Sequence, residues 1–289
     1  KLAPLFGKME IRSVADLNFA AAQAKAAEFG VRAETVDDLL AANDIDIVVN
    51  LTIPAAHFEV TRSILLAGKH AFSEKPLVLS LSEGKALRDL ATQNNLRIGS
   101  APDTFLGGAH QLARAAIDDG AVGDILGGTC HVLSHGMEHW HPDPDFFFQP
   151  GGGPVLDLGP YYLTNLIQLI GPIRAVCAMT GRGFETRTIS NGPRDGEVVA
   201  VETPTNIHAL LEFQNGAIVT LGASWDVWKS DHPNMELHGA KGTMTLPDPN
   251  FFGGDVLCSV RDGDMVGLAA WDHPLGVANQ GEDTNKVAN

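Results

Sequence analysis

The chain has 289 residues, with 20 Lys or Arg against 35 Asp or Glu, which gives a formal net charge of −15. Nucleic acid and anionic lipid repel such a chain, so neither is the default partner. Hydrophobic residues make up 44% and charged residues 19%, a composition typical of a globular chain long enough for two domains. No apolar stretch approaches the roughly 18 residues of a membrane span, and Lys1–Pro4 lacks a signal-peptide pattern. We therefore expect a cytoplasmic protein.

The first hundred residues alternate short strands with helices. Glu10–Ala15 is rich in strand-forming residues, and Leu17–Phe29 is an alanine-rich helix that ends before Gly30. Further strands are expected at 45–51, 70–73 and 96–100, and further helices at 36–42, 57–67 and 81–93. The continuous apolar run at 45–51 is typical of a strand covered on both faces. This alternation predicts an α/β domain over 1–104, an open parallel sheet with helices on both faces.

From about Phe105 the pattern changes. Helices are expected at 108–118 and, as a single helix, at about 155–170 before Gly171-Pro172. The other expected elements are short strands, at 125–134, 173–180, 206–213, 217–224, 235–239, 243–246 and 256–260. Asn215-Gly216 indicates a hairpin. We therefore expect a second, α+β domain over 105–289, built on a large open antiparallel sheet.

The cysteines Cys130, Cys177 and Cys258 are far apart and follow no metal-binding spacing. An odd number of dispersed cysteines indicates reduced structural thiols rather than a disulfide framework.

Asp16 follows the first expected strand. In dinucleotide-binding folds an acidic residue after the second strand accepts hydrogen bonds from the adenosine ribose, and its charge disfavours the 2′-phosphate of NADP. Asp16 can instead be the N-cap of the next helix. The G-x-G-x-x-G loop that precedes such a strand is not in the sequence, so we expect either that the complete protein continues at its N-terminus or that it holds no dinucleotide in this way.

Glu74-Lys75-Pro76 stands at the C-terminal end of an expected parallel strand, the edge where open α/β sheets bind ligands. A lysine there can donate to a substrate hydroxyl or shift the pKa of a neighbouring group. The alternative is an exposed ion pair followed by a turn proline.

A glycine-rich turn, Gly151-Gly152-Gly153, opens the expected helix that carries Asp157 and Tyr161. The i, i+4 spacing places both side chains on one helix face. Together with a lysine from elsewhere they could take a proton from an alcohol, because a phenol is a poor base until a nearby cation lowers its pKa. The alternative is an acidic first turn followed by a core tyrosine.

The segment 134–145 contains three histidines, three carboxylates and a tryptophan. His135, His139 and His141 suggest a metal site, but the loop has no fixed ligand geometry and no evident fourth ligand, so we expect no metal. A polar wall with the aromatic face of Trp140 suits a carbohydrate better, and a plain surface loop is the alternative. We treat the isolated histidines as structural: His110, His208, His232, His238 and His273.

These residues together resemble the Gfo/Idh/MocA oxidoreductase family, named for glucose–fructose oxidoreductase and inositol dehydrogenase. The resemblance rests on Asp16, on 52–57, on 67–76 and on Gly151–Tyr161. It implies a Rossmann domain that binds NAD(P), with Lys75 as a catalytic residue. It also implies a group of residues around the cofactor: Asp16, Asn18, Thr52, Pro54, His57, Glu74, Lys75 and Pro76.

Many members have a histidine where this chain has Tyr161, which resembles the branch with a tyrosine as proposed acid/base. The family's phosphate loop and closing helical segment are not in the sequence, and we expect the complete protein to continue at both ends.

The resemblance predicts an NAD-dependent oxidoreductase that oxidises a secondary hydroxyl of a sugar, sugar derivative or cyclic polyol. Lys75, Asp157 and Tyr161 are the expected catalytic residues, and they contact the substrate together with His135, Trp140 and His141. A redox glycosidase of the same fold and a non-catalytic sensor of NAD(P) or sugar are the alternatives. We expect a homodimer or homotetramer formed through the second domain's sheet, which needs a partner for its uncovered face.

Overall fold

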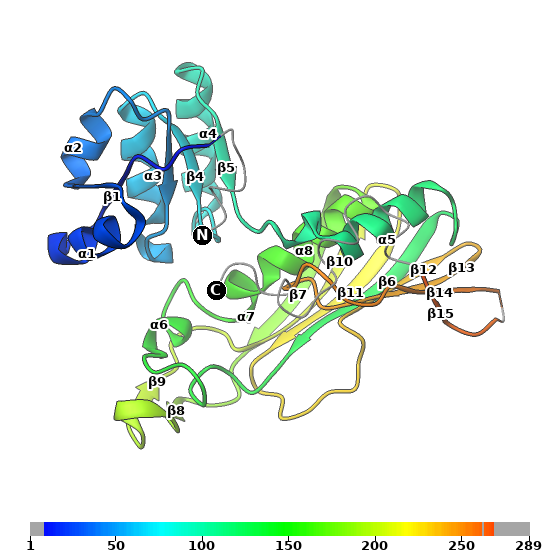
Figure 1. Cartoon of the computed structure of the whole chain (residues 1–289). Helices are drawn as coiled ribbons and strands as arrows, with labels where there is room; N and C mark the ends of the chain where they lie inside the picture. Colours follow the sequence, from blue (N-terminus) through cyan, green and yellow to red (C-terminus); the bar gives the residue numbers. More distant parts are fainter. Residues whose placement is uncertain (1–8, 262, 269–289) are drawn as a thin grey trace. The chain divides into compact units, whose positions relative to one another are not determined.

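The computed structural model describes residues 9–261 and 263–268, and the chain divides into two compact units between Ala101 and Pro102 (Figure 1). Within these described residues, no helix combines the length and apolar character that crossing a membrane requires.

The first unit is a parallel α/β structure, as predicted. Strands β1 (Ser13–Ala15) and β2 (Arg32–Glu34) form one parallel pair, and β3 (Ile47–Asn50), β4 (His70–Ser73) and β5 (Ile98–Ser100) form a second parallel sheet. The helices are α1 (Phe19–Phe29), α2 (Val36–Ala41), η2 (Pro54–Ala56), α3 (His57–Leu66) and α4 (Leu81–Gln93). Helices α3 and α4 bury Ile64, Leu65 and Leu87 against β4, which forms the core of this unit.

Local sequence signals account for most of these boundaries. Gly30 ends α1 in the left-handed conformation with φ of 68°, where a side chain would be strained. Ser80 and Glu83 form the predicted capping box at α4. The structure differs from the predictions at two strands. Strand β2 was not predicted, because Arg32–Glu34 lacks an apolar pattern. Strand β3 was expected to be covered on both faces, but Ile47 and Val49 are more than half exposed.

The second unit is built on an eight-stranded sheet. Its strand order is β15 (Val266–Gly267), β14 (Leu257–Val260), β13 (Gly242–Leu246), β12 (Met235–Gly239), β6 (Ile125–Leu133), β11 (Ile218–Ser224), β10 (Asn206–Phe213) and β7 (Ile173–Gly181). Strands β6 and β11 run parallel, with Thr220 opposite Thr129. The sheet is therefore mixed rather than entirely antiparallel.

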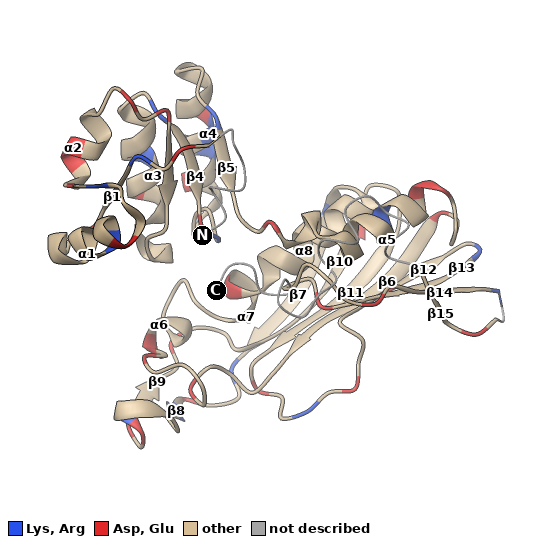
Figure 2. Cartoon of the chain, viewed as in Figure 1, with Lys and Arg blue, Asp and Glu red and all other residues tan. Residues whose placement is uncertain are grey.

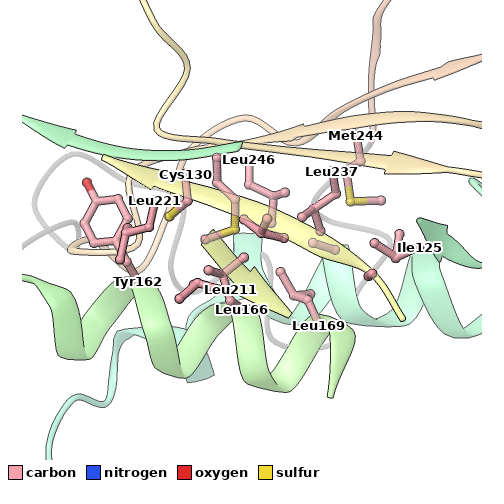
Figure 3. Packing of buried hydrophobic residues seen from close by; sticks show 14 of the residues in the cluster. Ile125, Cys130, Tyr162, Leu166, Leu169, Leu211, Leu221, Leu237, Met244 and Leu246 are labelled. Atoms are coloured by element: carbon pink, nitrogen blue, oxygen red, sulfur yellow. The ribbon is translucent and has the colours of Figure 1, made fainter. Parts of the chain in front are cut away.

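Helices α5 (Gly108–Asp118) and α8 (Gly159–Ile170) cover one face of this sheet (Figure 1). Figure 3 shows the core between the helices and the sheet, where Leu166 and Leu169 of α8 pack against strand residues such as Leu211 and Leu221. Cys130 belongs to this core, Cys258 is also buried, Cys177 is exposed, and none of the three is in a disulfide. We call the opposite side of the sheet the open face.

A small lobe extends from the sheet and was not predicted from the sequence. It contains α6 (Asp145–Phe148) and a hairpin of β8 (Thr186–Thr188) and β9 (Val198–Ala200). Its core packs Phe148, Ile189 and Val199 around the fully buried Trp225.

Arg187 of β8 is the buried charge that ties this lobe to the sheet. Its guanidinium donates to Glu138 Oε1 at 3.0 Å and to the Trp225 carbonyl at 3.0 Å, and it pairs with Asp226. The arginine side chain is 4% exposed and Glu138 6%, so each charge is compensated almost entirely by protein groups. Removing one partner leaves the others buried and unpaired.

We expect Arg187→Ala to lower the free energy of unfolding by about 3–5 kcal/mol, the usual cost of breaking a buried ion pair. Urea denaturation followed by circular dichroism measures it. The matched control is Arg174→Ala, which removes an exposed ion pair with Glu212 and should cost at most about 1 kcal/mol. Equal losses in the two variants would contradict the role given to Arg187.

A second buried polar network joins α5, α8 and the segment after β13. His110 lies 2.8 Å through Nε2 from the Phe251 carbonyl, and its Nδ1 lies 3.0 Å from the Asn165 amide nitrogen. A carbonyl only accepts, so Nε2 carries the proton and Nδ1 accepts from Asn165. Burial lowers the pKa of His110, because a charged ring would lose its hydration and turn a second N–H toward the Asn165 amide.

The lowered pKa predicts how stability depends on pH. The contribution of His110 is present above its unfolded pKa of about 6.5 and is lost as the pH falls through that value, because the unfolded chain then binds the proton more readily. For one histidine, the free energy of unfolding changes by at most about 1.4 kcal/mol per pH unit. Urea denaturation between pH 8 and 5 should show a shallower loss for His110→Gln than for the parent chain; parallel curves would contradict this account.

Candidate active site

The first unit gathers several predicted cofactor residues at one sheet edge. Strands β3 and β4 are parallel neighbours with Asn50 opposite Ser73, so the segments that follow them leave the same edge side by side. One segment carries Thr52 and Pro54, and the other is Glu74–Pro76. The carboxyl ends of parallel strands are where such folds bind ligands.

A buried histidine fastens these two segments together. His57, at the start of α3, has no exposed surface, and its Nδ1 lies 2.6 Å from the Pro76 carbonyl while Nε2 lies 2.8 Å from the Thr52 carbonyl. Asn50 adds a second connection: its amide donates to the His57 carbonyl at 3.2 Å, and its Oδ1 accepts from the Thr52 hydroxyl at 2.7 Å. We call Asn50, Thr52, His57 and Pro76 the histidine clip.

Lys75 directly precedes Pro76 of the clip. The Lys75–Pro76 peptide is cis, and the Lys75 N–H donates to Glu74 Oε2 at 3.0 Å. Glu74 is fixed in turn by its own N–H, which donates to the Asn50 carbonyl at 2.9 Å. Glu74 and Lys75 are half-buried, so the lysine backbone is held on both sides by residues of the same edge.

Asp16 follows β1 directly and is exposed. Its Oδ1 accepts the Asn18 N–H at 2.7 Å, and Asn18, rather than Asp16, is the N-cap residue of α1. The interpretation of Asp16 as the helix cap is therefore wrong. Its role toward a ribose stays a prediction.

In the second unit, the glycine-rich turn packs closely on neighbouring backbone. Gly153 has φ of 88°, and a Cβ there would lie 2.8 Å from the Pro204 carbonyl; one on Gly152 would lie 2.3 Å from the Phe147 carbonyl. Both positions therefore require glycine. The turn packs against α6 and against the segment before β10.

The helix expected at 155–170 is two helices, α7 (Pro154–Asp157) and α8, separated at Leu158. Pro160 has no N–H to donate, and its ring disfavours a continuous helix through the preceding turn. Asp157 therefore ends α7 while Tyr161 lies in the first turn of α8, so the prediction that one regular helix face carries both is wrong. Both side chains are half-buried.

The histidine-rich segment divides into two parts. His135 stacks on Trp228 with 3.3 Å between ring centroids, and burial lowers its pKa, with the Arg187 charge adding to the effect. Trp140 and His141 instead face α6, where the His141 ring meets Phe147 at 5.2 Å. Trp140 is 53% exposed, which leaves much of its surface accessible.

Metal coordination finds no support in the described part of the chain. No set of three His, Cys, Asp or Glu residues is placed there to hold an ion. Of the other histidines, His232 stacks on His131 with 4.4 Å between centroids and His238 lies 2.9 Å from Glu236; His273 lies outside the described residues.

Acidic side chains occur on elements of both units, including α2 and α7 (Figure 2). Within the described residues, the acidic side chains are thus spread over both units rather than gathered on one element.

Sequence reasoning missed Asn50, Trp228 and Phe184. Asn50 had a usable signal, because it is the one polar residue in the apolar run 45–51 apart from Asp46. Trp228 and Phe184 lie in loops whose conformation the sequence pattern does not indicate.

Two family models match the chain. The model described as an oxidoreductase family with an NAD-binding Rossmann fold matches residues 3–101, and the GFO/IDH/MocA C-terminal domain matches residues 110–245. The first unit thus has the NAD-binding Rossmann fold.

Named relatives include two dehydrogenases. Levoglucosan dehydrogenase of Pseudarthrobacter phenanthrenivorans is 27% identical over 254 residues, covering 81% of this chain and 64% of that protein. Inositol 2-dehydrogenase of Rhizobium meliloti is 32% identical over 233 residues, covering 80% and 66%. The chain therefore spans less than two thirds of either relative.

The fold is also that of solved structures. Levoglucosan dehydrogenase in complex with NADH superposes with a TM-score of 0.77 at 23% identity, over 95% of this chain and 76% of that one. With both of its units matched by models of the same family, the chain belongs to the Gfo/Idh/MocA family of oxidoreductases.

Proposed function

We propose that this protein uses NAD to oxidise a secondary hydroxyl of a sugar, a sugar derivative or a cyclic polyol. The observation that carries the proposal is Lys75, held by the histidine clip at the carboxyl edge of an NAD-binding Rossmann fold. Asp157 and Tyr161 beside the glycine-rich turn supply the other groups that proton transfer needs.

The residues present fit a dinucleotide. Asp16 is exposed at the end of β1, where a carboxylate can accept from ribose hydroxyls, and its charge favours NAD over NADP. Asn18, Thr52, Pro54, His57, Glu74, Lys75 and Pro76 are the further residues we assign to the cofactor. NAD, when bound, supplies the acceptor for the hydride that leaves the substrate carbon.

Tyr161 is the proposed base. It lies in the first turn of α8, near the N-terminal end of that helix. Lys75 is the proposed cation that assists removal of the hydroxyl proton from the substrate. Asp157 is proposed to orient a substrate hydroxyl.

The substrate class follows from the polar and aromatic groups on the histidine-rich segment. Trp140, which is 53% exposed, offers an aromatic face, and His135 and His141 are the further residues of this segment that we assign to the substrate. An aromatic face suits a pyranose or a cyclohexane polyol, which has apolar C–H faces and equatorial hydroxyls. The names of the two relatives, levoglucosan dehydrogenase and inositol 2-dehydrogenase, are consistent with this class.

Lys75→Ala tests the catalytic assignment. We expect a fall in kcat of at least about 100-fold with NAD affinity changed less than about threefold, because the lysine acts on the reacting hydroxyl. Tyr161→Phe should lower kcat by a similar factor. Initial rates of NADH formation with a panel of sugars and polyols, and NAD titration by calorimetry, give the two quantities.

The matched control is Lys85→Ala, a lysine on α4 outside the proposed site, which should change neither quantity. Equal loss of turnover and NAD affinity in Lys75→Ala would contradict the role of Lys75. Release of an aglycone from aryl glycosides without net NADH would instead identify a redox glycosidase, and NAD binding with neither product would identify a sensor.

We also propose that two or four copies associate through the open face of the second unit. Met179, Leu210 and Ile218 are all on this face, and each is more than half exposed. An apolar sheet face without covering helices is stabilised by a partner surface.

Leu210→Arg should shift the mass measured by light scattering toward the monomer, because it places a charge in the middle of the apolar face. The control is Leu81→Arg, which changes a leucine in the first unit that is more exposed than Leu210. A monomeric parent chain, or an unchanged oligomer in Leu210→Arg, would contradict this mode of association.

A further inference from the structure

An exposed tryptophan stands out in the second unit. Trp228 lies in the segment between β11 and β12 and is 80% exposed, although the His135 ring stacks on one of its faces at 3.3 Å and 14°. Because one face is covered and the residue is still so exposed, the other face of the indole is open to solvent. Leaving a large aromatic face in water is unfavourable unless something binds it.

Phe184 extends this aromatic surface. It is 44% exposed and meets the His135 ring edge-on, with 6.1 Å between centroids, and the Arg187 guanidinium lies 4.6 Å from its centroid. We call His135, Phe184 and Trp228 the aromatic platform. Three segments far apart in the sequence converge to form it.

The described residues next to the platform include buried polar atoms without hydrogen-bond partners. Within the described residues, five buried polar atoms around the Arg187 network have no hydrogen-bond partner: Ser134 Oγ, His135 Nδ1, Glu138 Oε2, Arg187 Nε and Trp225 Nε1. Glu138, Arg187 and Trp225 are each at least 94% buried. Buried polar atoms are nearly always paired, so a cluster of unpaired ones indicates a place that accepts hydroxyl groups or water.

Charged pairs surround the platform. Arg182 and Glu185 flank Phe184 and lie 2.7 Å apart, and Lys229 and Asp231 follow Trp228 at 3.7 Å. An aromatic face with ionic groups at its rim matches a pyranose ring, whose C–H face packs on the aromatic ring while its equatorial hydroxyls reach the charged groups.

The platform and the glycine-rich turn share one packed region of the second unit. A Cβ on Gly153 would meet Thr203 and Pro204, the adjoining Thr205 hydroxyl donates to Asp226 at 2.8 Å, and Asp226 pairs with Arg187. Leu158, between α7 and α8, packs on the same cluster as Trp225. The platform therefore belongs to the same packed region as the turn that precedes Asp157 and Tyr161.

We propose that the aromatic platform binds a second sugar ring, so that the preferred substrate is a glycoside of at least two rings rather than a free monosaccharide. This inference rests on the proposed function, because it names the substrate class of that enzyme. A protein partner is the rival occupant, but three rings with charged rims make a much smaller surface than the roughly 1,200–2,000 Å² of a stable protein interface.

Binding of defined sugars tests the proposal without relying on turnover. Calorimetry or saturation-transfer NMR would compare glucose, galactose and mannose with cellobiose, maltose and lactose in the presence of NAD. We expect at least one disaccharide to bind about tenfold tighter than its monosaccharide, a difference of about 1.4 kcal/mol, because its second ring stacks on the platform. Trp228→Ala should abolish that preference, and Trp228→Phe should keep most of it.

Leu81→Ala is the matched control, because Leu81 is 83% exposed and belongs to the first unit; it should bind every sugar like the parent chain. Unfolding curves of Trp228→Ala show whether the lobe stays folded, and Trp228→Phe keeps the test valid if it does not. Equal affinity for mono- and disaccharides in the parent chain, or an unchanged preference in Trp228→Ala, would overturn the proposal. So would self-association that depends on Trp228, which would mark a protein contact.

NADH formation on the same sugars separates this proposal from the one on which it rests. Disaccharide binding that depends on Trp228 without any NADH would support the platform and contradict the oxidation. NADH from monosaccharides, with no effect of Trp228 on the preference for disaccharides, would overturn the platform alone.

Discussion

The candidate chemistry of the first unit depends on one fully buried side chain, His57. Three exposed residues follow β3, and nothing in their own sequence would hold them in one conformation. The His57 ring lies between the Thr52 carbonyl of this segment and the Pro76 carbonyl of the other, and Asn50 Oδ1 accepts from the Thr52 hydroxyl. Fixing each of these residues costs about 1–2 kcal/mol of backbone entropy, which buried hydrogen bonds and packing must offset. The clip therefore makes the position of Lys75 a property of the fold rather than of a mobile loop.

In the second unit, packing fixes the positions of the proposed site residues. The eight-stranded sheet and helices α5 and α8 form a core that fixes α8, and the glycines of the turn allow α7 to approach α6 closely. Pro160 then breaks the helix, so that Tyr161 begins a new one. A residue in a first helical turn is near unpaired N–H groups and the positive end of the dipole. In the middle of one long helix, the same tyrosine would have neither.

The sequence predicted elements well where the local pattern was strong. The capping box at Ser80, the glycine at the end of α1 and the β–α alternation all have short-range physical causes, and the α/β class of the first unit follows from them. The failures have long-range causes. The β8–β9 hairpin is held by the buried Arg187 network, and β6 pairs in parallel with β11, some ninety residues away in the chain.

The same distinction applies to the site. Lys75, Asp157 and Tyr161 stood out because glycine, proline and charged residues cluster around them, whereas Asp16 was partly misjudged because an aspartate before a helix has two common uses. The aromatic platform gave no signal, because His135, Phe184 and Trp228 become neighbours only through tertiary packing. The proposed catalytic residues thus lie in short motifs near the ends of regular elements. The residues proposed to bind the substrate lie in loops, where a few substitutions can change specificity while the clip and the sheet stay intact.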